Sequence, residues 1–509
     1  MLDSLQMLAN GFLTAGSLIN LLMAALGALV GTLVGVLPGL GAASAIAILI
    51  PVTAVLEPTQ AIIMLAGIYY GAQYGGSTTA ILLNIPGETA SIPTCLDGYP
   101  MAKQGRGGPA LGMSAIASCT AGLLGVVGLA FFAPIFAEYA LKFGPPEYFA
   151  LMILSLSIIV NFSGEQVLKG FAMGILGYVL SMVGMGITSG LPRLTFGNVV
   201  LTRGFDSIAI IIGLFALPEV FKGMEEKTVA ISSGKIGKIY PSLADLKQSF
   251  WPIIRGWAIG FFLGLLPGCS PAVSTFMSYD VEKRVSKHPE RFGHGEIAGV
   301  AGPEAANNAN SQAGFIPLFS FGIPASPALA VLLAGLMIYG LQPGPMLFTQ
   351  QDGFVWTVIA SMFIGNFMLL FLNLPLVGIW VRLTRIPYGI LGPVILFLCV
   401  IGSYSSRNSM FDVGVTIVFG ILGYFLQKYR FPIVPLVLCS ILEPTMERGF
   451  IQSMAMSSDN LLIFIQRPIS CGILILTVIL TIISFRAMRK TKKMAAEAAG
   501  DDVDIGSGS

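Results

Sequence analysis

Two polar stretches interrupt the apolar sequence, and they contain the side chains best suited to binding a small anion. The first is YYGAQYGGSTTAILLNIPGETAS at 69–91, and the second is EAANNANSQAGFIPLFSFGIPAS at 304–326. Neither contains Lys or Arg, so hydroxyls, amides and the N-terminal ends of broken helices would have to hold a carboxylate. The residues that we predict to bind substrate are Ser77, Thr78, Thr79, Asn84, Pro86, Gly87, Asn307, Asn308, Asn310, Ser311, Pro324 and Ser326.

Two Leu-Pro-Gly turns and two carboxylates are candidates for holding a coupling cation. GVLPG at 35–39 and GLLPG at 264–268 each follow an apolar segment, and the carbonyls of an unwound turn suit a hard cation such as Na⁺. Glu88 and Glu304 flank the polar stretches, and a carboxylate inside a membrane is a functional candidate by default. We expect no organic cofactor, and Na⁺ is the one metal ion considered. The predicted cation-binding or coupling residues are Pro38, Gly39, Ser44, Glu88, Pro267, Gly268, Ser270 and Glu304.

A structural explanation of the small polar residues stays open beside the functional one. Gly, Ser and Thr permit close packing of membrane helices, so no single Ser or Gly decides between the two. Three amides within 307–310 are harder to explain by packing alone. Other carboxylates lie close to the ends of predicted spans, where an interfacial position explains them: Glu57, Glu138, Glu219, Asp412 and Glu443.

The composition predicts that these residues are held by an α-helical membrane protein. Of the 509 residues, 55% are hydrophobic and 11% are charged, whereas soluble domains carry about 25% charged residues. About 11–14 apolar segments are long enough to enter a membrane. The fold class is therefore an all-α polytopic membrane protein with broken helices and re-entrant hairpins. A net charge of +2 without a basic patch argues against nucleic acid as a partner.

Lys and Arg in the loops predict which side of the membrane each loop faces. The segment after the last apolar run holds five of them between 486 and 493, so the C-terminus is predicted to be cytoplasmic. The same rule places the loops 223–255 and 281–296 inside. One apolar stretch, 256–280, separates these loops, and it has Pro267-Gly268 near its centre. A re-entrant hairpin is therefore favoured over a single crossing, although the crossing stays open.

Two pairs of short motifs predict that the chain consists of two homologous halves. The Leu-Pro-Gly turns recur at an offset of 229, and Asn-Ile-Pro-Gly at 84–87 recurs as Gly-Ile-Pro-Ala at 322–325, at an offset of 238. Both pairs occur in the same order. The predicted organisation is a first half at 1–222, a cytoplasmic linker at 223–255, a second half at 256–487 and a disordered cytoplasmic tail at 488–509.

At these motifs the sequence resembles the large membrane subunit of the tripartite tricarboxylate transporters, the TctA type. The resemblance covers nearly the whole chain in order, and the longer motifs are specific. It rests on GVLPGLG at 35–41, the 69–91 stretch, LDGYPMAKQGRGGPALG at 96–112, EKRVSKHPERFGHGEIAGVAGPEAANNANSQAGFIPLFSFGIPAS at 282–326 and IFIQRPIS at 463–470.

The resemblance implies a secondary transporter of the bacterial inner membrane that imports a di- or tricarboxylate with Na⁺ or H⁺. Its implied partners are a small four-helix membrane subunit and a periplasmic solute-binding protein, with a higher-order oligomer left open. Two residues depart from the family pattern. Ala325 stands where Gly is expected, and Glu443 is followed by Pro444 where two adjacent Glu are expected. Both departures argue against assuming that the substrate is citrate.

Two other classes of function were weighed against this one. A carboxylate channel or exporter that acts alone would need no binding protein. A membrane enzyme would need a catalytic signature, and the sequence contains no HExxH, no GxSxG and no phosphate-binding loop. We therefore expect a transporter subunit and not an enzyme.

Overall fold

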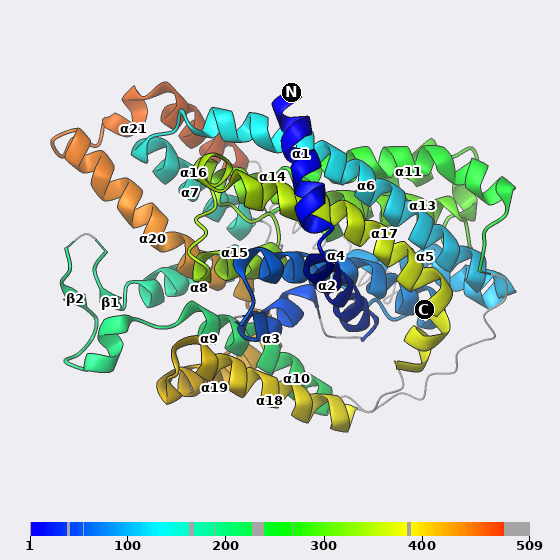
Figure 1. The fold of residues 1–509 in the computed structure, drawn as a ribbon, viewed down its shortest axis with the longest axis horizontal. Helices are drawn as coiled ribbons and strands as arrows, with labels where there is room; N and C mark the ends of the chain where they lie inside the picture. The colour runs from blue at the N-terminus through cyan, green and yellow to red at the C-terminus, as the bar shows by residue number, and fades with distance from the viewer. Residues whose placement is uncertain are drawn as a thin grey trace, which may run out of the picture. The chain divides into compact units, whose positions relative to one another are not determined.

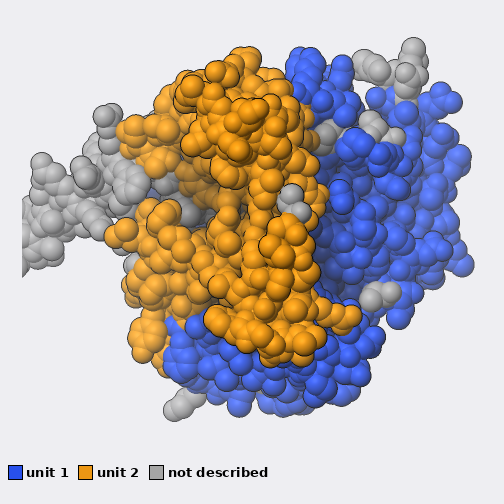
Figure 2. Space-filling model, turned by 90° about the vertical axis from the view of Figure 1, so that its left-hand side faces the viewer, with its two compact units in different colours: residues 1–142, 206–425 blue, residues 143–205, 426–509 orange. Residues whose placement is uncertain are grey.

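The computed structural model describes residues 2–37, 41–53, 55–161, 167–187, 189–225, 239–266, 268–383 and 388–482. Nearly every element in these ranges is a helix, which confirms the predicted all-α class (Figure 1). The strands that the structure describes are one short antiparallel pair, β1 (Gly184–Met185) and β2 (Pro192–Arg193). The chain divides into two compact units, Met1–Lys142 with Asp206–Phe425 (unit 1) and Phe143–Phe205 with Leu426–Ser509 (unit 2) (Figure 2).

Unit 1 holds most of the helices, and it contains both polar stretches. Its elements are α1 (Leu2–Ala15), α2 (Leu18–Val36), α3 (Ala42–Thr53), α4 (Pro58–Leu83), η1 (Thr89–Ser91), α5 (Ile92–Met101), η2 (Ala102–Arg106), α6 (Gly107–Ala140), α9 (Ser207–Ile211), η5 (Ile212–Ala216), α10 (Leu217–Glu225), α11 (Leu243–Gly264), α12 (Pro271–Val285), η6 (Pro289–Arg291), α13 (Ala298–Ala313), α14 (Phe315–Phe321), α15 (Pro327–Ile338), α16 (Pro345–Gln350), α17 (Asp352–Leu383), α18 (Tyr388–Arg407) and α19 (Met410–Lys428), whose last turn reaches unit 2.

Unit 2 is built from the remaining helices and the strand pair. Its elements are α7 (Pro145–Asn161), α8 (Val167–Ser181), β1, β2, η4 (Val199–Arg203), α20 (Ile433–Met456), α21 (Ile463–Gln466) and a helix at Pro468–Ile482.

Six helical segments in the described ranges are long and apolar enough to cross a membrane, so the chain is a multi-pass membrane protein. Four shorter apolar helices accompany them, and the predicted number of crossings and the re-entrant hairpins stay predictions. The six are Leu18–Val36, Thr89–Ala140, Ser207–Glu225, Asp352–Leu376, Gly389–Arg407 and Met410–Lys428, and the shorter four are Ala42–Thr53, Val167–Ser181, Pro327–Ile338 and Pro468–Ile482.

The structure differs from one expectation about local structure and adds detail to another. The polar stretch 69–91 was expected to interrupt its helix, but α4 is continuous from Pro58 to Leu83. The segment 243–255, assigned to the linker, is helical and forms the first half of α11. A reciprocal capping box between Ser242 and Asp245 starts this helix. The rest of the linker from 226 to 238 and the tail lie outside the described residues.

Asp245 also makes an ion pair that joins α11 to the start of α6. Its carboxylate lies 2.6 Å from the guanidinium of Arg106. Burial opposes ionisation of Asp245, but hydrogen bonds from Ser242 and the positive charge of Arg106 outweigh it and hold the pKa of Asp245 below its usual value. The carboxylate therefore stays charged at neutral pH, where it caps the helix and pairs with Arg106.

Continuity of α4 follows from its packing against α2 through glycines. Six glycines in two helix pairs, α2 with α4 and α11 with α13, approach the facing backbone so closely that an added Cβ would lie 2.2–2.7 Å from a carbonyl oxygen. Such contact offsets the low helix propensity of Gly. The six glycines are Gly27, Gly31 and Gly35 on α2 and Gly256, Gly260 and Gly264 on α11, and the facing carbonyls belong to Met64, Ile68 and Ala72 on α4 and to Gly302, Ala306 and Asn310 on α13.

These contacts follow the offsets found in the sequence. Each α2 glycine corresponds to an α11 glycine at an offset of 229, and each facing α4 residue corresponds to an α13 residue at an offset of 238. The Leu-Pro-Gly and Ile-Pro sequence motifs recur at these same two offsets, 229 and 238. Similar backbone contacts therefore occur at positions that these offsets relate, and the two homologous halves stay a prediction.

The two Ile-Pro motifs follow helix ends of the same geometry. Asn84 ends α4 with φ 59° and ψ 27°, and Gly322 ends α14 with φ 72° and ψ 25°. The N–H of Ile85 donates to the Thr79 carbonyl at 3.4 Å, and the N–H of Ile323 donates to the Pro317 carbonyl at 3.2 Å. Both ends are left-handed caps that satisfy late carbonyls before the chain turns. The polar stretches are thus helices up to these caps.

Replacing Gly260 with Ala should destabilise the protein by about 1–3 kcal/mol, because the new Cβ would lie 2.2 Å from the Ala306 carbonyl oxygen and force α11 away from α13. Thermal unfolding of the purified protein in detergent measures this. Gly378→Ala on α17 is the matched control, since a Cβ at Gly378 meets nothing within 4 Å and Ala favours the helix. Equal melting temperatures for the two variants would contradict the packing argument.

Candidate functional site

Glu304 lies at the centre of a cage of hydroxyl groups inside unit 1. Ser77 on α4 donates to both carboxylate oxygens at 2.7 Å, and Thr94 on α5 donates to one of them at 2.5 Å. Ser114 and Ser118 on α6 donate to the other oxygen at 3.0 and 3.2 Å. The side chain of Glu304 is 1% exposed. We call these five residues the Glu304 cage.

Helix geometry explains how the cage is assembled. Ser114 and Ser118 are four residues apart, so they lie on one face of α6. Glu304 is on α13, which packs against both α6 and α4. Each hydroxyl has one proton to donate, and four such donors stabilise an ionised carboxylate that burial would otherwise disfavour. The four hydrogen bonds partly offset the cost of burying a negative charge at Glu304, and the oxygens of the cage can also contact a cation.

A small polar cavity lies beside the cage. Its volume is about 10 Å³, and its lining includes Tyr74, Thr78, Ser114 and Asn373. This is room for about one water molecule. Ser114 belongs both to this cavity and to the Glu304 cage, so a water here would connect the cage to the amide of Asn373.

Glu88 occupies the start of a helix. One carboxylate oxygen accepts the backbone N–H of Ala42 at 2.8 Å, and Ala42 is the first residue of α3. The side chain also interacts with Gln73 on α4. After the cap at Asn84 the chain turns back along α4, because the N–H of Gly87 meets the Gly76 carbonyl at 3.4 Å. This return places the carboxylate of Glu88 at a helix N-terminus, the usual position for a bound anion.

Tyr69 brings predicted residues of the two halves together. Its phenol lies 3.3 Å from the Ser326 hydroxyl. The phenol also interacts with the Ser311 side chain and with the charge of Glu88. Glu88 comes from the first polar stretch, and Ser311 and Ser326 come from the second. The two stretches therefore meet around Tyr69, some distance from the exposed turn at Asn84.

The amides of the second stretch lie inside α13 and not at a helix break. Asn310 donates to the Cys269 carbonyl at 3.0 Å and to the Ser274 hydroxyl at 2.7 Å, which ties α13 to the turn after α11 and to the first turn of α12. Asn308 donates to the Glu304 carbonyl, one helical turn away. The side-chain oxygens of Asn307 and Asn308 are buried without a hydrogen-bond partner among the described residues. Both oxygens are free to accept a ligand.

The remaining predicted residues have local or structural positions. Ser44 donates to the Phe215 carbonyl and Thr79 donates to the Gly76 carbonyl. Asn84 and Pro86 lie at the turn, where Asn84 is exposed, and Pro324 is buried beside Ser326. In the second Leu-Pro-Gly turn, Gly268 has φ 78°, and Ser270 caps α12 without a side-chain hydrogen bond. Pro38, Gly39 and Pro267 lie outside the described residues.

Asp97 is a buried carboxylate that the sequence analysis did not single out. One oxygen accepts three backbone N–H groups, from Gly293, Gly295 and Glu296, at 2.8–2.9 Å. The other oxygen accepts the phenol of Tyr279 at 2.9 Å. Asp97 therefore fixes the loop before α13, the helix that carries Glu304.

Replacing Asp97 with Asn should lower the free energy of unfolding by about 2 kcal/mol, because hydrogen bonds to a charged acceptor are worth about 1.5–3 kcal/mol. Asp97→Ala should cost more, since four donors would then lose their acceptor. Thermal unfolding in detergent measures both. Asp280→Asn is the control: Asp280 is exposed and pairs only with Arg284 among the described residues, so a change within about 0.5 kcal/mol is expected. A D97N protein as stable as D280N would show that the hydrogen bonds to the Asp97 carboxylate contribute little to stability.

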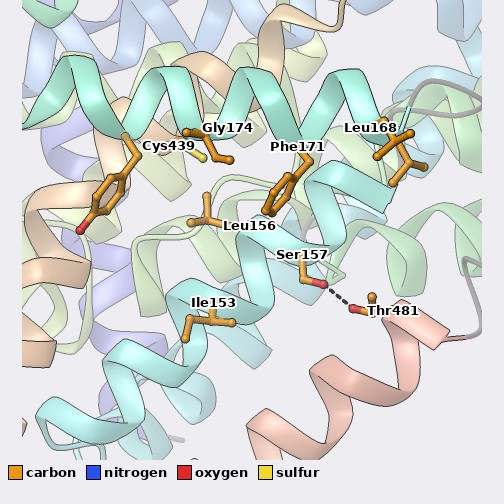
Figure 3. A pocket seen from close by; sticks show the side chains of 11 residues that line it. Ile153, Leu156, Ser157, Leu168, Phe171, Gly174, Cys439 and Thr481 are labelled. Atoms are coloured by element: carbon orange, nitrogen blue, oxygen red, sulfur yellow. Dashed lines mark hydrogen bonds between the residues drawn. The ribbon is translucent and has the colours of Figure 1, made fainter.

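An apolar cavity in unit 2 is unsuited to a carboxylate. It has a volume of about 490 Å³ and lies between α7, α8, α20 and the Pro468–Ile482 helix, and Figure 3 shows its lining. The polar contact drawn across it joins Ser157 to Thr481 at 2.6 Å. The other side chains there are mostly aliphatic or aromatic, so an anion would lose its hydration without gaining partners.

Comparison with known proteins identifies the family. The model described as "Tripartite tricarboxylate transporter TctA family" matches residues 21–438. The chain belongs to this family. It is thus a membrane component of a tripartite transporter, as the motifs implied.

Two curated relatives of this TctA-family protein come from Agrobacterium vitis. An uncharacterized 52.8 kDa protein in the TAR-I ttuC' 3' region is 42% identical over 97% of this chain and 98% of its own length. An uncharacterized protein in the TAR-II ttuC' 3' region is 43% identical over 46% of this chain and 97% of its own length. No solved structure matches the chain.

Proposed function

We propose that this TctA-family protein imports a di- or tricarboxylate across the bacterial inner membrane together with Na⁺ or H⁺. A periplasmic solute-binding protein delivers the substrate, and a small four-helix membrane subunit completes the complex in the lipid bilayer. Family membership supports the transporter role. The convergence of both polar stretches around Tyr69 is the observation that supports a shared binding region.

The difference between Glu88 and Ser326 supports a location for the substrate carboxylate. Under the offset of 238, Ser326 is the second-half equivalent of Glu88. In the first half the Glu88 carboxylate occupies the start of α3. In the second half the equivalent helix, α12, begins at Pro271, and the side chain of its N-cap residue Ser270 makes no cap hydrogen bond. By analogy with Glu88, a substrate carboxylate at the start of α12, next to Ser270 and on the side where the offset places Ser326, would complete the same arrangement.

The Glu304 cage is the proposed site of cation coupling. A buried carboxylate with hydroxyl oxygens around it fits either a proton or a hard cation. The unpartnered oxygens of Asn307 and Asn308 lie on the same helix within four residues of Glu304. When bound, the cation would neutralise the charge of Glu304. The Leu-Pro-Gly turns stay a second proposed cation region.

Uptake into proteoliposomes tests the function. The protein is reconstituted with its small membrane subunit, and uptake of radiolabelled carboxylate is measured with and without the purified binding protein, under a Na⁺ gradient or a pH gradient. We expect uptake only when the binding protein and one of the gradients are present. Equal uptake without the binding protein would favour a carboxylate channel or exporter that acts alone.

Replacing Ser326 with Glu should lower uptake by about 100-fold, because a tethered carboxylate would occupy the proposed anion position, as Glu88 does in the first half. Ser326→Ala is the matched control. It removes the hydroxyl that meets Tyr69 and caps α15, so a loss of about 1 kcal/mol in stability is expected, with uptake lowered by no more than about 10-fold. Proteoliposome uptake measures both. Normal uptake by S326E would exclude this location.

A further inference from the structure

Glu443 on α20 is a buried carboxylate in unit 2, which contains none of the residues proposed above for transport. The side chain is 1% exposed. Both of its carboxylate oxygens are buried, and neither has a hydrogen-bond partner among the described residues. An ionised carboxylate in this state would be very unfavourable, because burial removes its hydration and nothing replaces it.

The backbone next to Glu443 is shaped by Pro444. A proline has no N–H, so the carbonyl of Ser440 lacks its usual partner in α20. The hydroxyl of Ser181 on α8 donates to this carbonyl at 2.9 Å. The helices also approach at Gly177, where an added Cβ would lie 2.0 Å from the Leu436 carbonyl. Close packing of α8 on α20 therefore keeps water from Glu443.

The nearest charged groups are a paired arginine and a second carboxylate. Glu447 lies one helical turn from Glu443 on α20, and Arg193 on β2 donates two hydrogen bonds to it at 2.7 and 3.0 Å. The Nε–H of Arg193 is buried without an acceptor among the described residues. One cluster thus holds two unpaired carboxylate oxygens and an unpaired guanidinium donor.

Other ionisable groups on the elements packed against α20 are engaged elsewhere or are neutral. Tyr178 on α8 faces the two carboxylates and is uncharged at neutral pH. Lys169, also on α8, donates to the Tyr429 carbonyl. On α7, Glu147 is paired with Arg467 at 2.7 Å. Arg193 is therefore the cation available to Glu443.

The surroundings favour a proton over a metal ion as the ligand of Glu443. A hard cation needs several oxygen ligands around it, and neither carboxylate oxygen has a hydrogen-bond partner among the described residues. A proton needs none. The Glu447 and Arg193 side chains are 14% and 25% exposed, so a proton can reach the cluster from solvent one turn away.

We propose that Glu443 is an exchangeable proton-binding site whose counter-ion is Arg193. With the proton bound, Glu443 is a neutral acid and Arg193 pairs with Glu447. When the proton leaves to solvent, the new carboxylate accepts the free Nε–H of Arg193, which then bridges Glu443 and Glu447. The atoms balance, because one proton is released and no other bond is made or broken.

Infrared spectroscopy of the purified protein tests this without transport. The carbonyl stretch of a protonated carboxylic acid should be present in the wild type at neutral pH and be lost in E443Q. The band should shift in D₂O, since the proton exchanges, and it should disappear as the pH is raised. Identical spectra for wild type and E443Q would overturn the proposal, and so would a band that does not respond to D₂O.

Two further variants keep the proposal falsifiable. In E443D the acid side chain is shorter and its surroundings change, so the frequency of the carbonyl stretch should shift. This variant replaces E443Q in the test if E443Q does not fold. In R193K the Nε donor is absent, so the band should persist to a pH at least about one unit higher than in the wild type. An unchanged titration in R193K would exclude Arg193 as the counter-ion.

Discussion

Replacing Glu304 with Gln is expected to lower carboxylate uptake by about 100-fold while the protein still folds and inserts. The carboxylate accepts four hydroxyl donors in a buried site. An amide has the same shape but no charge, so a coupling cation loses an interaction of about 3 kcal/mol, which corresponds to about a 100-fold loss of affinity. Uptake into proteoliposomes across a range of Na⁺ concentrations and pH values measures the loss.

The stability of E304Q should fall less than its activity. The amide oxygen can accept hydroxyls as before, but the amide nitrogen cannot, so the hydroxyls that it faces must turn to other acceptors. The expected loss is about 1–3 kcal/mol. A low uptake together with a near-normal melting temperature would therefore indicate loss of function and not unfolding.

Glu138→Gln is the matched control for Glu304→Gln. Glu138 is exposed near the end of α6, the helix that supplies two hydroxyls to the cage. The substitution removes one negative charge without touching the Glu304 cage, so uptake should stay within about twofold of the wild type and stability within about 0.5 kcal/mol. If E304Q transports as well as E138Q, the cage does not couple a cation to transport.

The sequence analysis singled out Glu304 as a candidate for cation coupling and Ser77 as a candidate for substrate binding, because a carboxylate and small polar residues stand out in apolar surroundings. It did not predict Thr94, Ser114 or Ser118, which complete the cage. These three residues are ordinary in their local sequence, and they acquire a role only when segments 186 to 210 residues apart in sequence come together. Asp97 was missed for the same reason, since its partners lie almost 200 residues away.

The sequence analysis also did not predict that α4 is a continuous helix. The glycines of α4 indicated a break, because Gly has a low helix propensity. Packing against α2 keeps α4 helical through this segment, since Gly67, Gly71 and Gly75 all face α2. By contrast, the capping box at Ser242 and Asp245 was readable in the sequence, and it would have placed the start of α11 within the predicted linker.

The turn after α4 gives the second large expected effect, through Gly87→Ala. A Cβ at Gly87 would lie 2.1 Å from the Gly35 carbonyl oxygen and 2.5 Å from the Cα of Gly76. Both contacts are with backbone atoms of packed helices, which cannot move aside as a flexible side chain could. We expect a loss of about 3 kcal/mol in stability and loss of uptake, because the returning chain that carries Glu88 would be displaced from the start of α3.

The second half supplies a natural comparison. Ala325 stands at the position of Gly87 under the offset of 238, and its Cβ is 3.4 Å from the Cβ position of Gly314, the equivalent of Gly76. This half of the molecule thus already accommodates the methyl group that the first half excludes. Ala325→Gly should therefore cost only about 1–1.5 kcal/mol, from the lost methyl and the added backbone freedom.

Measuring the two variants together separates packing from binding. Thermal unfolding reports the packing, and uptake of radiolabelled carboxylate reports the position of Glu88 and of the region around Ser326. G87A should lose stability and uptake together, whereas A325G should keep most of both. If G87A is as well tolerated as A325G, the first turn is not held against α2 as the structure has it. The carboxylate of Glu88 would then have no fixed place at the start of α3, and the comparison that puts substrate beside Ser326 would lose its basis.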